Sequence, residues 1–320
     1  MQLLPTTLKT ITITNDVGDN TQHIMDENMI QAVNAALAIG RPLLVRGEPG
    51  IGKSQLAKAV AKQLNRVFLH FVTDAKTESR DLLWHFDAVA RLAEAQIIRA
   101  SQNGTSKDDP LAISKFIVPG CLWWALNWET AEKQANQCKR NAPPIAEGCS
   151  PKNGAILLID EIDKADSDVP NGLLEPLGSG HFHPHGLDAA VTAQGVKPLV
   201  IITTNEERSL PDAFVRRCLL LHLAFPQEQQ GQQTFLVERA QLNFPALETE
   251  VLESAAEMLV EDRSFAQNNN LYPLPGQAEY FDLLRGIQRL SQHTGTSAQD
   301  YIQQLRRYTY QKHTDFHNNG

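Results

Sequence analysis

The chain has 320 residues, about the length of two ordinary domains. Hydrophobic residues make up 42% of it and charged residues 21%, values that exclude collagen-like, coiled-coil and wholly disordered proteins. The formal net charge of −8 is unfavourable for binding the negatively charged phosphates of nucleic acid over a broad surface, so we do not expect direct nucleic-acid binding.

The cysteines and the apolar runs indicate the compartment of the protein and its relation to membranes. The four cysteines form no C-x-x-C pair, which is typical of reduced thiols rather than a disulfide framework or a zinc ribbon. The chain does not begin with a charged segment followed by a long apolar stretch, so we see no secretory signal. No apolar run approaches the ~20 residues that a membrane helix needs. We therefore expect a cytoplasmic protein without a membrane partner.

Helix-like and strand-like segments alternate through the first two thirds of the chain. Apolar spacing predicts helices over residues 27–39, 53–65 and 82–100. Nearly continuous apolar runs predict strands over residues 42–46, 67–72, 155–160 and 198–204. Runs without polar alternation are typical of strands buried on both faces, so we predict an α/β fold with helices on both faces of a parallel sheet.

The composition and the apolar spacing of the sequence change near Pro226. Beyond it the chain is rich in Gln and poor in strand-like runs, and helical spacing covers residues 249–260, 277–290 and 298–310. We predict a nucleotide-binding core over residues 1–226, with an insertion at about 82–153, followed by a small all-helical lid domain over 227–320. Within the insertion, Trp123, Trp124 and Trp128 fit either buried packing or a partner-binding surface.

The strongest motif is GEPGIGKS, which fits G-x-x-x-x-G-K-[ST] between a predicted strand and a predicted helix. Its glycines let backbone N–H groups wrap a phosphate, and the helix N-terminus adds partial positive charge. Lys53 would reach the β and γ phosphates, and the Ser54 hydroxyl would bind Mg²⁺. The predicted nucleotide-binding residues are Gly47, Glu48, Pro49, Gly50, Ile51, Gly52, Lys53, Ser54 and Gln55.

A second motif supplies acidic groups. The apolar run LLID ends in Asp160 and Glu161, the pattern of a Walker B element. Asp160 would hold Mg²⁺, and Glu161 would orient and deprotonate the attacking water. The alternative is a carboxylate pair that only caps a turn. The segment DKAD (163–166) loosely matches a guanine-binding motif but lies too close to the Walker B residues to reach a base, so we expect ATP.

Two further elements follow. Asn205 ends the strand LVIITT and could hydrogen-bond the γ-phosphate and the water, although an Asn there can also simply cap the strand. Arg216 and Arg217 follow eleven and twelve residues later, and a guanidinium there could stabilise charge on the nucleotide of a neighbouring subunit. A solvated basic pair at a helix end is the alternative.

The motifs GEPGIGKS, LLIDEIDKAD, VIITTNEE and LPDAFVRRC together resemble the AAA+ ATPases, and among them the MoxR-type group. The resemblance covers about residues 27–230. It implies ATP and Mg²⁺ as cofactors, a hexameric ring of identical subunits with nucleotide at the interfaces, and often a protein partner with a von Willebrand factor A domain. It makes Asn205 the sensor-1 residue and Arg217, or alternatively Arg216, the arginine finger that acts in trans.

The resemblance implies an ATP-hydrolysing, chaperone-like remodeller or maturation factor for a partner protein. The alternative is a nucleotide-dependent motor or switch in a nucleic-acid-directed restriction or defence system, and salt-dependent DNA binding would distinguish the two. One departure from the family pattern concerns the lid. The predicted helix that starts near Gln277 has no Arg or Lys near its start, where a sensor-2 residue is expected, and Arg285 lies two turns further on.

Overall fold

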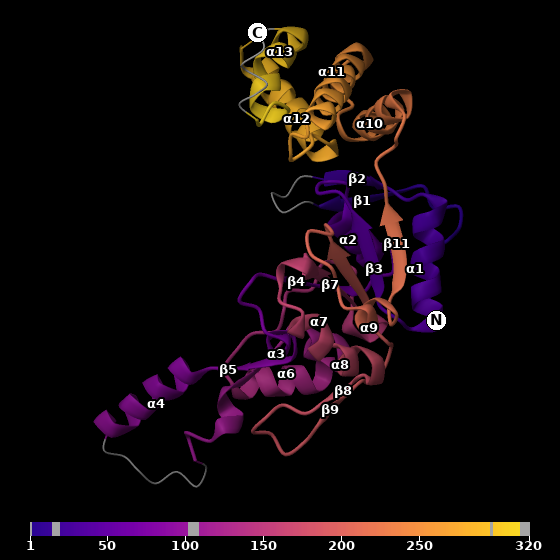
Figure 1. The fold of residues 1–320 in the computed structure, drawn as a ribbon. Coiled ribbons are helices and arrows are strands. Elements are labelled where there is room, and N and C mark those ends of the chain that lie inside the picture. The colour runs from indigo at the N-terminus through magenta and orange to yellow at the C-terminus, as the bar shows by residue number, and fades with distance from the viewer. Residues whose placement is uncertain (1, 15–19, 102–108, 295–296, 314–320) are drawn as a thin grey trace. The chain divides into compact units, whose positions relative to one another are not determined.

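The computed structural model describes residues 2–14, 20–101, 109–294 and 297–313 (Figure 1). Residues 102–108 of the predicted insertion thus lie outside the described residues. The chain divides into two compact units, which we call the sheet unit and the lid unit. The sheet unit contains residues 1–8, 26–46 and 56–221, and the lid unit contains residues 9–25, 47–55 and 222–320. The sequence-based boundary at Pro226 stays a prediction.

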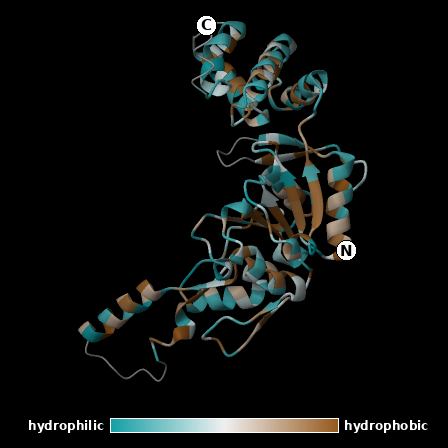
Figure 2. Cartoon of the chain, viewed as in Figure 1, coloured by the Kyte–Doolittle hydropathy of each residue, from teal (hydrophilic) through white to brown (hydrophobic). Residues whose placement is uncertain are grey.

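The sheet unit is built around five strands in the order β11-β3-β10-β7-β4. Their bounds are β3 (Leu43–Gly47), β4 (Val67–Val72), β7 (Ala155–Asp160), β10 (Leu199–Thr204) and β11 (Leu219–Leu223). β10 pairs in parallel with β3 and β7, and β4 pairs in parallel with β7. Every residue of β10 is buried, as is all of β7 except Asp160. The prediction of a parallel α/β sheet is confirmed, and its strands are largely brown in Figure 2.

Of the five strands in this sheet, β11, at one edge, is the one that the sequence analysis did not predict. Its residues alternate between buried and more exposed positions, and Leu220 is 54% exposed. This pattern differs from the buried runs of β7 and β10, which gave the clearest strand predictions.

Helices and a hairpin complete the core of the sheet unit. They are α1 (Glu27–Ile39), α2 (Lys53–Gln63), α7 (Asp168–Gly172), α8 (Leu174–Ser179), α9 (Asp212–Val215) and the hairpin β8 (His181–Phe182) with β9 (Val191–Thr192). Helix α1 has the predicted bounds because both ends carry capping residues. The Asp26 side chain accepts from the Met29 N–H at 2.7 Å, and Gly40 ends the helix in the left-handed conformation.

The segment predicted as one helix over residues 82–100 is interrupted. It forms α3 (Ser79–Leu83), the strand β5 (Trp84–Phe86) and α4 (Ala88–Ser101). β5 pairs in antiparallel fashion with β6 (Ile117–Pro119), about thirty residues later in the chain. The helix prediction is confirmed over residues 88–100 and wrong over residues 84–87, because this strand pairing is long-range and local apolar spacing does not reveal it.

Beyond β6, the segment forms α5 (Cys121–Leu126) and α6 (Trp128–Gln137). Trp123 is 2% exposed and packs edge-on to Phe182, with ring centroids 5.9 Å apart. Trp124 is 5% exposed and contacts Trp128. Of the two readings left open by the sequence, buried packing is the observed one.

The lid unit combines helices with a short hairpin from the N-terminal region. It contains β1 (Thr10–Thr14), β2 (Asn20–Ile24), α10 (Gln229–Asn243), α11 (Thr249–Asn268), α12 (Gln277–Thr294) and α13 (Ala298–Thr309). The hairpin contacts α10 through the side-chain amide of Asn243, which bonds both backbone groups of Gln22 as a paired strand would. Its Oδ1 accepts from the Gln22 N–H at 2.8 Å, and its Nδ2 donates to the Gln22 carbonyl at 3.1 Å. Among the described residues, no helix is both long and apolar enough to span a membrane.

Candidate functional site

The phosphate-loop motif forms a tight backbone turn between β3 and α2. Gly50 has φ +76° and Gly52 has φ +102°, backbone conformations that side chains with a Cβ rarely adopt. A Cβ at Gly47 would lie 2.3 Å from the Leu223 carbonyl oxygen, and one at Gly50 would lie 2.6 Å from the Ala278 Cβ. Glycine is thus required by close approach at Gly47, by the turn conformation at Gly52, and by both at Gly50.

Lys53 begins α2 and reaches back over the loop. Its side chain is buried, and Nζ donates to the Gly47 carbonyl at 2.7 Å and to the Glu48 carbonyl at 2.9 Å. Of the other predicted binding residues, Glu48 and Pro49 are exposed, Ile51 is buried, and Ser54 and Gln55 are half-buried in the first turn of the helix. The loop therefore has the strand–turn–helix context that phosphate binding requires, and the individual roles stay predictions.

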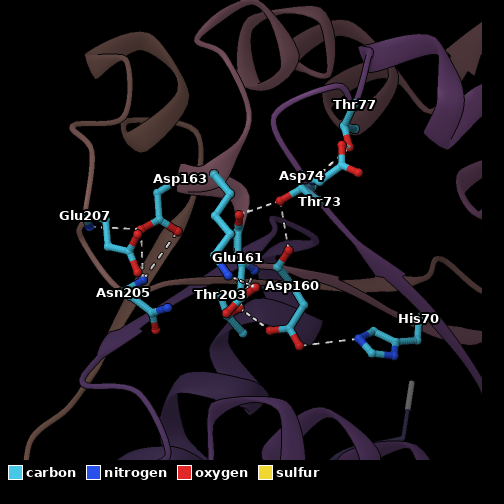
Figure 3. A network of polar contacts seen from close by, with 11 residues as sticks. His70, Thr73, Asp74, Thr77, Asp160, Glu161, Asp163, Thr203, Asn205 and Glu207 are labelled. Carbon is cyan, nitrogen blue, oxygen red and sulfur yellow. Dashed lines mark hydrogen bonds and ion pairs between the residues drawn. The ribbon is translucent and has the colours of Figure 1, made fainter. Parts of the chain in front are cut away.

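The predicted Walker B carboxylates lie where β7 ends (Figure 3). Asp160 accepts a hydrogen bond on Oδ1 from the Thr203 hydroxyl, and its Oδ2 lies 3.4 Å from His70 Nε2. Glu161 follows in the left-handed conformation, φ 58° and ψ 45°, and its N–H donates to Thr203 Oγ1 at 2.9 Å. A non-glycine residue in this region is uncommon and typical of functional sites. Thr203 thus positions both acidic residues.

The Glu161 carboxylate pairs with Lys164 one turn later, at 2.6 Å. This hydrogen bond raises the pKa of Lys164, so the ammonium stays charged across the physiological range. The carboxylate is therefore held beside a fixed cation while it remains partly exposed to solvent.

Asn205 lies directly after β10, and Asp163 holds the chain at this point. The Asp163 carboxylate is buried and accepts from the Asn205 N–H at 3.2 Å and from the Glu207 N–H at 3.0 Å. The Asn205 side chain extends away from Asp163 in Figure 3. A buried carboxylate that accepts backbone N–H groups fixes the loop, so Asp163 orients the predicted sensor residue. The sequence reading weighed Asp163 only as a part of a guanine motif and missed this role.

The predicted arginine-finger residues lie at the other end of the strands. Arg216 and Arg217 are exposed and are separated from β11 by Cys218. The first residue of β11, Leu219, donates its N–H to the Pro42 carbonyl at 2.8 Å. Pro42 precedes β3, so both arginines lie at the amino-terminal end of β3, a strand length from the edge that holds Asp160. Arg217 lines a cavity of about 340 Å³ together with Arg41 and other residues. Neither arginine is thus placed to act beside Asp160 of its own chain.

The residues fit a magnesium ion by their donor chemistry. Mg²⁺ prefers hard oxygen ligands, and the predicted ligands are the Ser54 hydroxyl and the Asp160 carboxylate. Asp160 is 15% exposed at its side chain and held by Thr203, which suits a carboxylate that must keep one orientation at a strand end.

The fold and the site together define a class of protein. A parallel sheet in the order β11-β3-β10-β7-β4, a glycine-rich loop after β3 and an acidic pair after β7 are the features of a P-loop AAA+ protein. The chain belongs to the family described as AAA domain (dynein-related subfamily), whose match covers residues 42–218, more than half of its length.

Similarity to individual proteins is more distant. The mitochondrial Lon protease homolog of Yarrowia lipolytica (strain CLIB 122 / E 150) is 24% identical over 193 residues, which are 58% of this chain and 12% of that protein. The chain thus spans about an eighth of the length of this relative. Among solved structures, the RuvB Holliday junction branch migration motor of Thermotoga maritima is 16% identical with a TM-score of 0.45, covering 88% of this chain and 67% of that one. A single-site mutant of the same RuvB is 15% identical with a TM-score of 0.48, covering 88% and 68%.

His23 is a buried titratable group beside the phosphate loop that the sequence did not single out. It lies in β2 and is 7% exposed, and its Cε1 would lie 3.6 Å from a Cβ at Gly52. Burial, followed by the charge of Arg239, lowers the pKa of His23 to about 4, while a hydrogen bond with Gln55 opposes the shift. The imidazole is therefore neutral in the folded protein at physiological pH.

We expect this shift to make stability depend on pH. An unfolded histidine has a pKa near 6.5, so the unfolded chain binds the proton first as the pH falls, and stability is lost from about pH 6.5 down to about pH 4. At pH 5 the loss from His23 should be about 2 kcal/mol relative to pH 7.5. Urea unfolding of the wild type and of His23→Gln at both pH values measures it. The variant should lose less stability by that amount, and an equal loss in both proteins would contradict the assignment.

Proposed function

We propose that the chain is a magnesium-dependent ATPase whose site forms at the carboxyl-terminal edge of the sheet. The sheet register supports this proposal most directly. Arg46, the residue before the phosphate loop, pairs with Thr204 at the end of β10, and Ile159, the residue before Asp160, pairs with Ile202 of the same strand. Because parallel strands end at one edge, the loop that begins at Gly47 and the carboxylates after β7 start from neighbouring strand ends.

Each predicted residue has a distinct role in this proposal. The loop N–H groups and Lys53 bind the phosphates, and Ser54 with Asp160 holds the metal ion. Mg²⁺, when bound, neutralises charge on the phosphate oxygens. Glu161 takes the proton of the attacking water, and the Asn205 amide orients that water. Arg217, or Arg216, contributes positive charge to the nucleotide of the next subunit.

At the level of the assembly, we propose a MoxR-type remodeller. The subunits form a homohexameric ring, and ATP hydrolysis drives a chaperone-like change or maturation step in a protein partner, one that can carry a von Willebrand factor A domain. The separation of the arginine pair from Asp160 within one chain favours a ring, because such a site is complete only when a second copy supplies the guanidinium. The four cysteines are free thiols, which suits the reducing cytoplasm.

Replacing Lys53 with Ala tests the phosphate-binding site. We expect ATP affinity to fall at least about tenfold, because the ammonium is the cationic donor that the loop holds in place. Titration of a fluorescent ATP analogue with and without Mg²⁺, together with phosphate release, measures the effect. Lys62→Ala is the matched control, since Lys62 is exposed in the last turn of the same helix. Wild-type protein that neither binds nor hydrolyses ATP with Mg²⁺ would refute the proposed function.

A further inference from the structure

Arg263 is a buried arginine that lies outside every sequence motif. It comes from the C-terminal half of α11, in the lid unit, and its side chain is 3% exposed. Its Nη2 lies 2.7 Å from each carboxylate oxygen of Glu48, and its Nη1 donates to the Pro275 carbonyl at 2.9 Å. Its guanidinium carbon lies 4.6 Å from the centroid of the Phe225 ring. Glu48 is the second residue of the phosphate loop, so this arginine joins the lid helices to that loop.

The cost of burying the charged Arg263 guanidinium makes its contact with Glu48 important. A buried guanidinium is costly unless charge and hydrogen-bond partners replace its water, and one carboxylate, one carbonyl and one aromatic face serve here. In the described part of the chain, Glu48 supplies the only carboxylate that contacts Arg263. The Glu48 side chain is itself 47% exposed, so solvent could satisfy it without Arg263. Arg263 therefore depends on the ion pair more than Glu48 does, and the pair restrains the position of Glu48 in the loop.

Glu48 also connects Arg263 to the phosphate-binding lysine. Its carbonyl oxygen accepts from Lys53 Nζ at 2.9 Å while its carboxylate accepts from Arg263. The loop touches the lid helices again at Gly50, where a Cβ would lie 2.6 Å from the Ala278 Cβ in the first turn of α12. The residue whose carbonyl oxygen Lys53 contacts is thus the same residue whose carboxylate Arg263 contacts.

We propose that Arg263 is a positioning residue that couples the lid helices to the phosphate loop through Glu48. The proposal rests on the proposed nucleotide binding and adds a link between lid and loop to it. Arg263 keeps Glu48, and with it the Gly47 and Glu48 carbonyls that Lys53 contacts, in the geometry that binds phosphate. A displacement of α11 changes that geometry, so lid position and nucleotide affinity depend on each other. Arg285, by contrast, pairs with Asp282 on its own helix at 2.8 Å.

Arg263→Met and Glu48→Gln, made singly and together in the full chain, test the pair, with Arg285→Met as the matched control. Amide hydrogen exchange over residues 47–52 without nucleotide reports the loop directly. We expect faster exchange there in both single variants and no change in Arg285→Met. The dissociation constant for ATP should rise about tenfold in Arg263→Met, while kcat at saturating ATP changes less than about threefold.

The double variant decides whether the two residues act as a pair. If they do, its affinity should equal that of Arg263→Met rather than show the product of the two single effects. Glu48→Gln keeps Arg263 in place and changes a half-exposed side chain, so it stays informative if Arg263→Met unfolds. Unchanged exchange and affinity in both single variants, or multiplicative effects in the double variant, would overturn the proposal. A wild-type protein that binds no ATP would instead overturn the proposed function, and the exchange data would still decide the role of Arg263.

Discussion

Replacing Glu161 with Gln is expected to leave ATP binding close to that of the wild type and to lower turnover by at least about a hundredfold. A positioned general base contributes about 10²- to 10⁴-fold to a rate, and the amide cannot accept the proton of the attacking water. The backbone of Glu161 is fixed by Thr203 at 2.9 Å, so the substitution should not move the strand end. Single-turnover phosphate release and equilibrium binding of ATP separate the two effects.

Glu207→Gln is the matched control for this experiment. Glu207 is exposed in the same loop region, and Asp163 contacts its backbone N–H rather than its side chain. We expect less than a threefold change in turnover, because its carboxylate makes no hydrogen bond to any of the described residues. A near wild-type rate in Glu161→Gln would show that another group takes the proton.

The sequence predicted the parts of the fold whose signal is local. The runs that form β7 and β10 are continuous and apolar because both faces of these strands are buried, and such runs are read from the sequence alone. Helix α1 was predicted over its observed bounds from its apolar spacing, which is also a local signal, and Asp26 and Gly40 cap the helix at those bounds. The glycine-rich loop was predicted because its spacing follows directly from the geometry of phosphate binding.

The parts that were missed depend on contacts between distant residues. β5 forms because it pairs with β6, and a helical apolar pattern over residues 82–100 does not reveal that pairing. Asp163 is one of many acidic residues until the end of β10 places two N–H groups against it. Arg263 looks like any helix arginine, and its role depends on Glu48, which lies 215 positions earlier in the chain. No local pattern marks either residue.

The arginine pair carries the largest expected effect. Arg217→Ala should lower ATP turnover by roughly 10³- to 10⁵-fold if Arg217 stabilises the charge of the transferring phosphoryl group, and Arg216→Ala shows which of the two does so. Strands rise about 3.3 Å per residue, so the arginines lie roughly 15 Å from the edge that holds Asp160. Arg41→Ala is the matched control, since Arg41 is exposed and lines the same cavity as Arg217.

Mixing Arg217→Ala subunits with Glu161→Gln subunits then tests whether the site is shared. Each variant alone should be inactive, but a site formed by an Arg217→Ala subunit beside a Glu161→Gln subunit contains one intact glutamate and one intact arginine. In randomly mixed rings of equal composition, about a quarter of the interfaces have this arrangement, so turnover should recover to about that fraction of the wild-type rate. Differently tagged subunits, recovered together, establish that mixed rings have formed. Mixed rings without activity would contradict a site shared between subunits. Near wild-type turnover in Arg217→Ala and Arg216→Ala on their own would instead show that the arginines are an ordinary solvated pair at the end of α9.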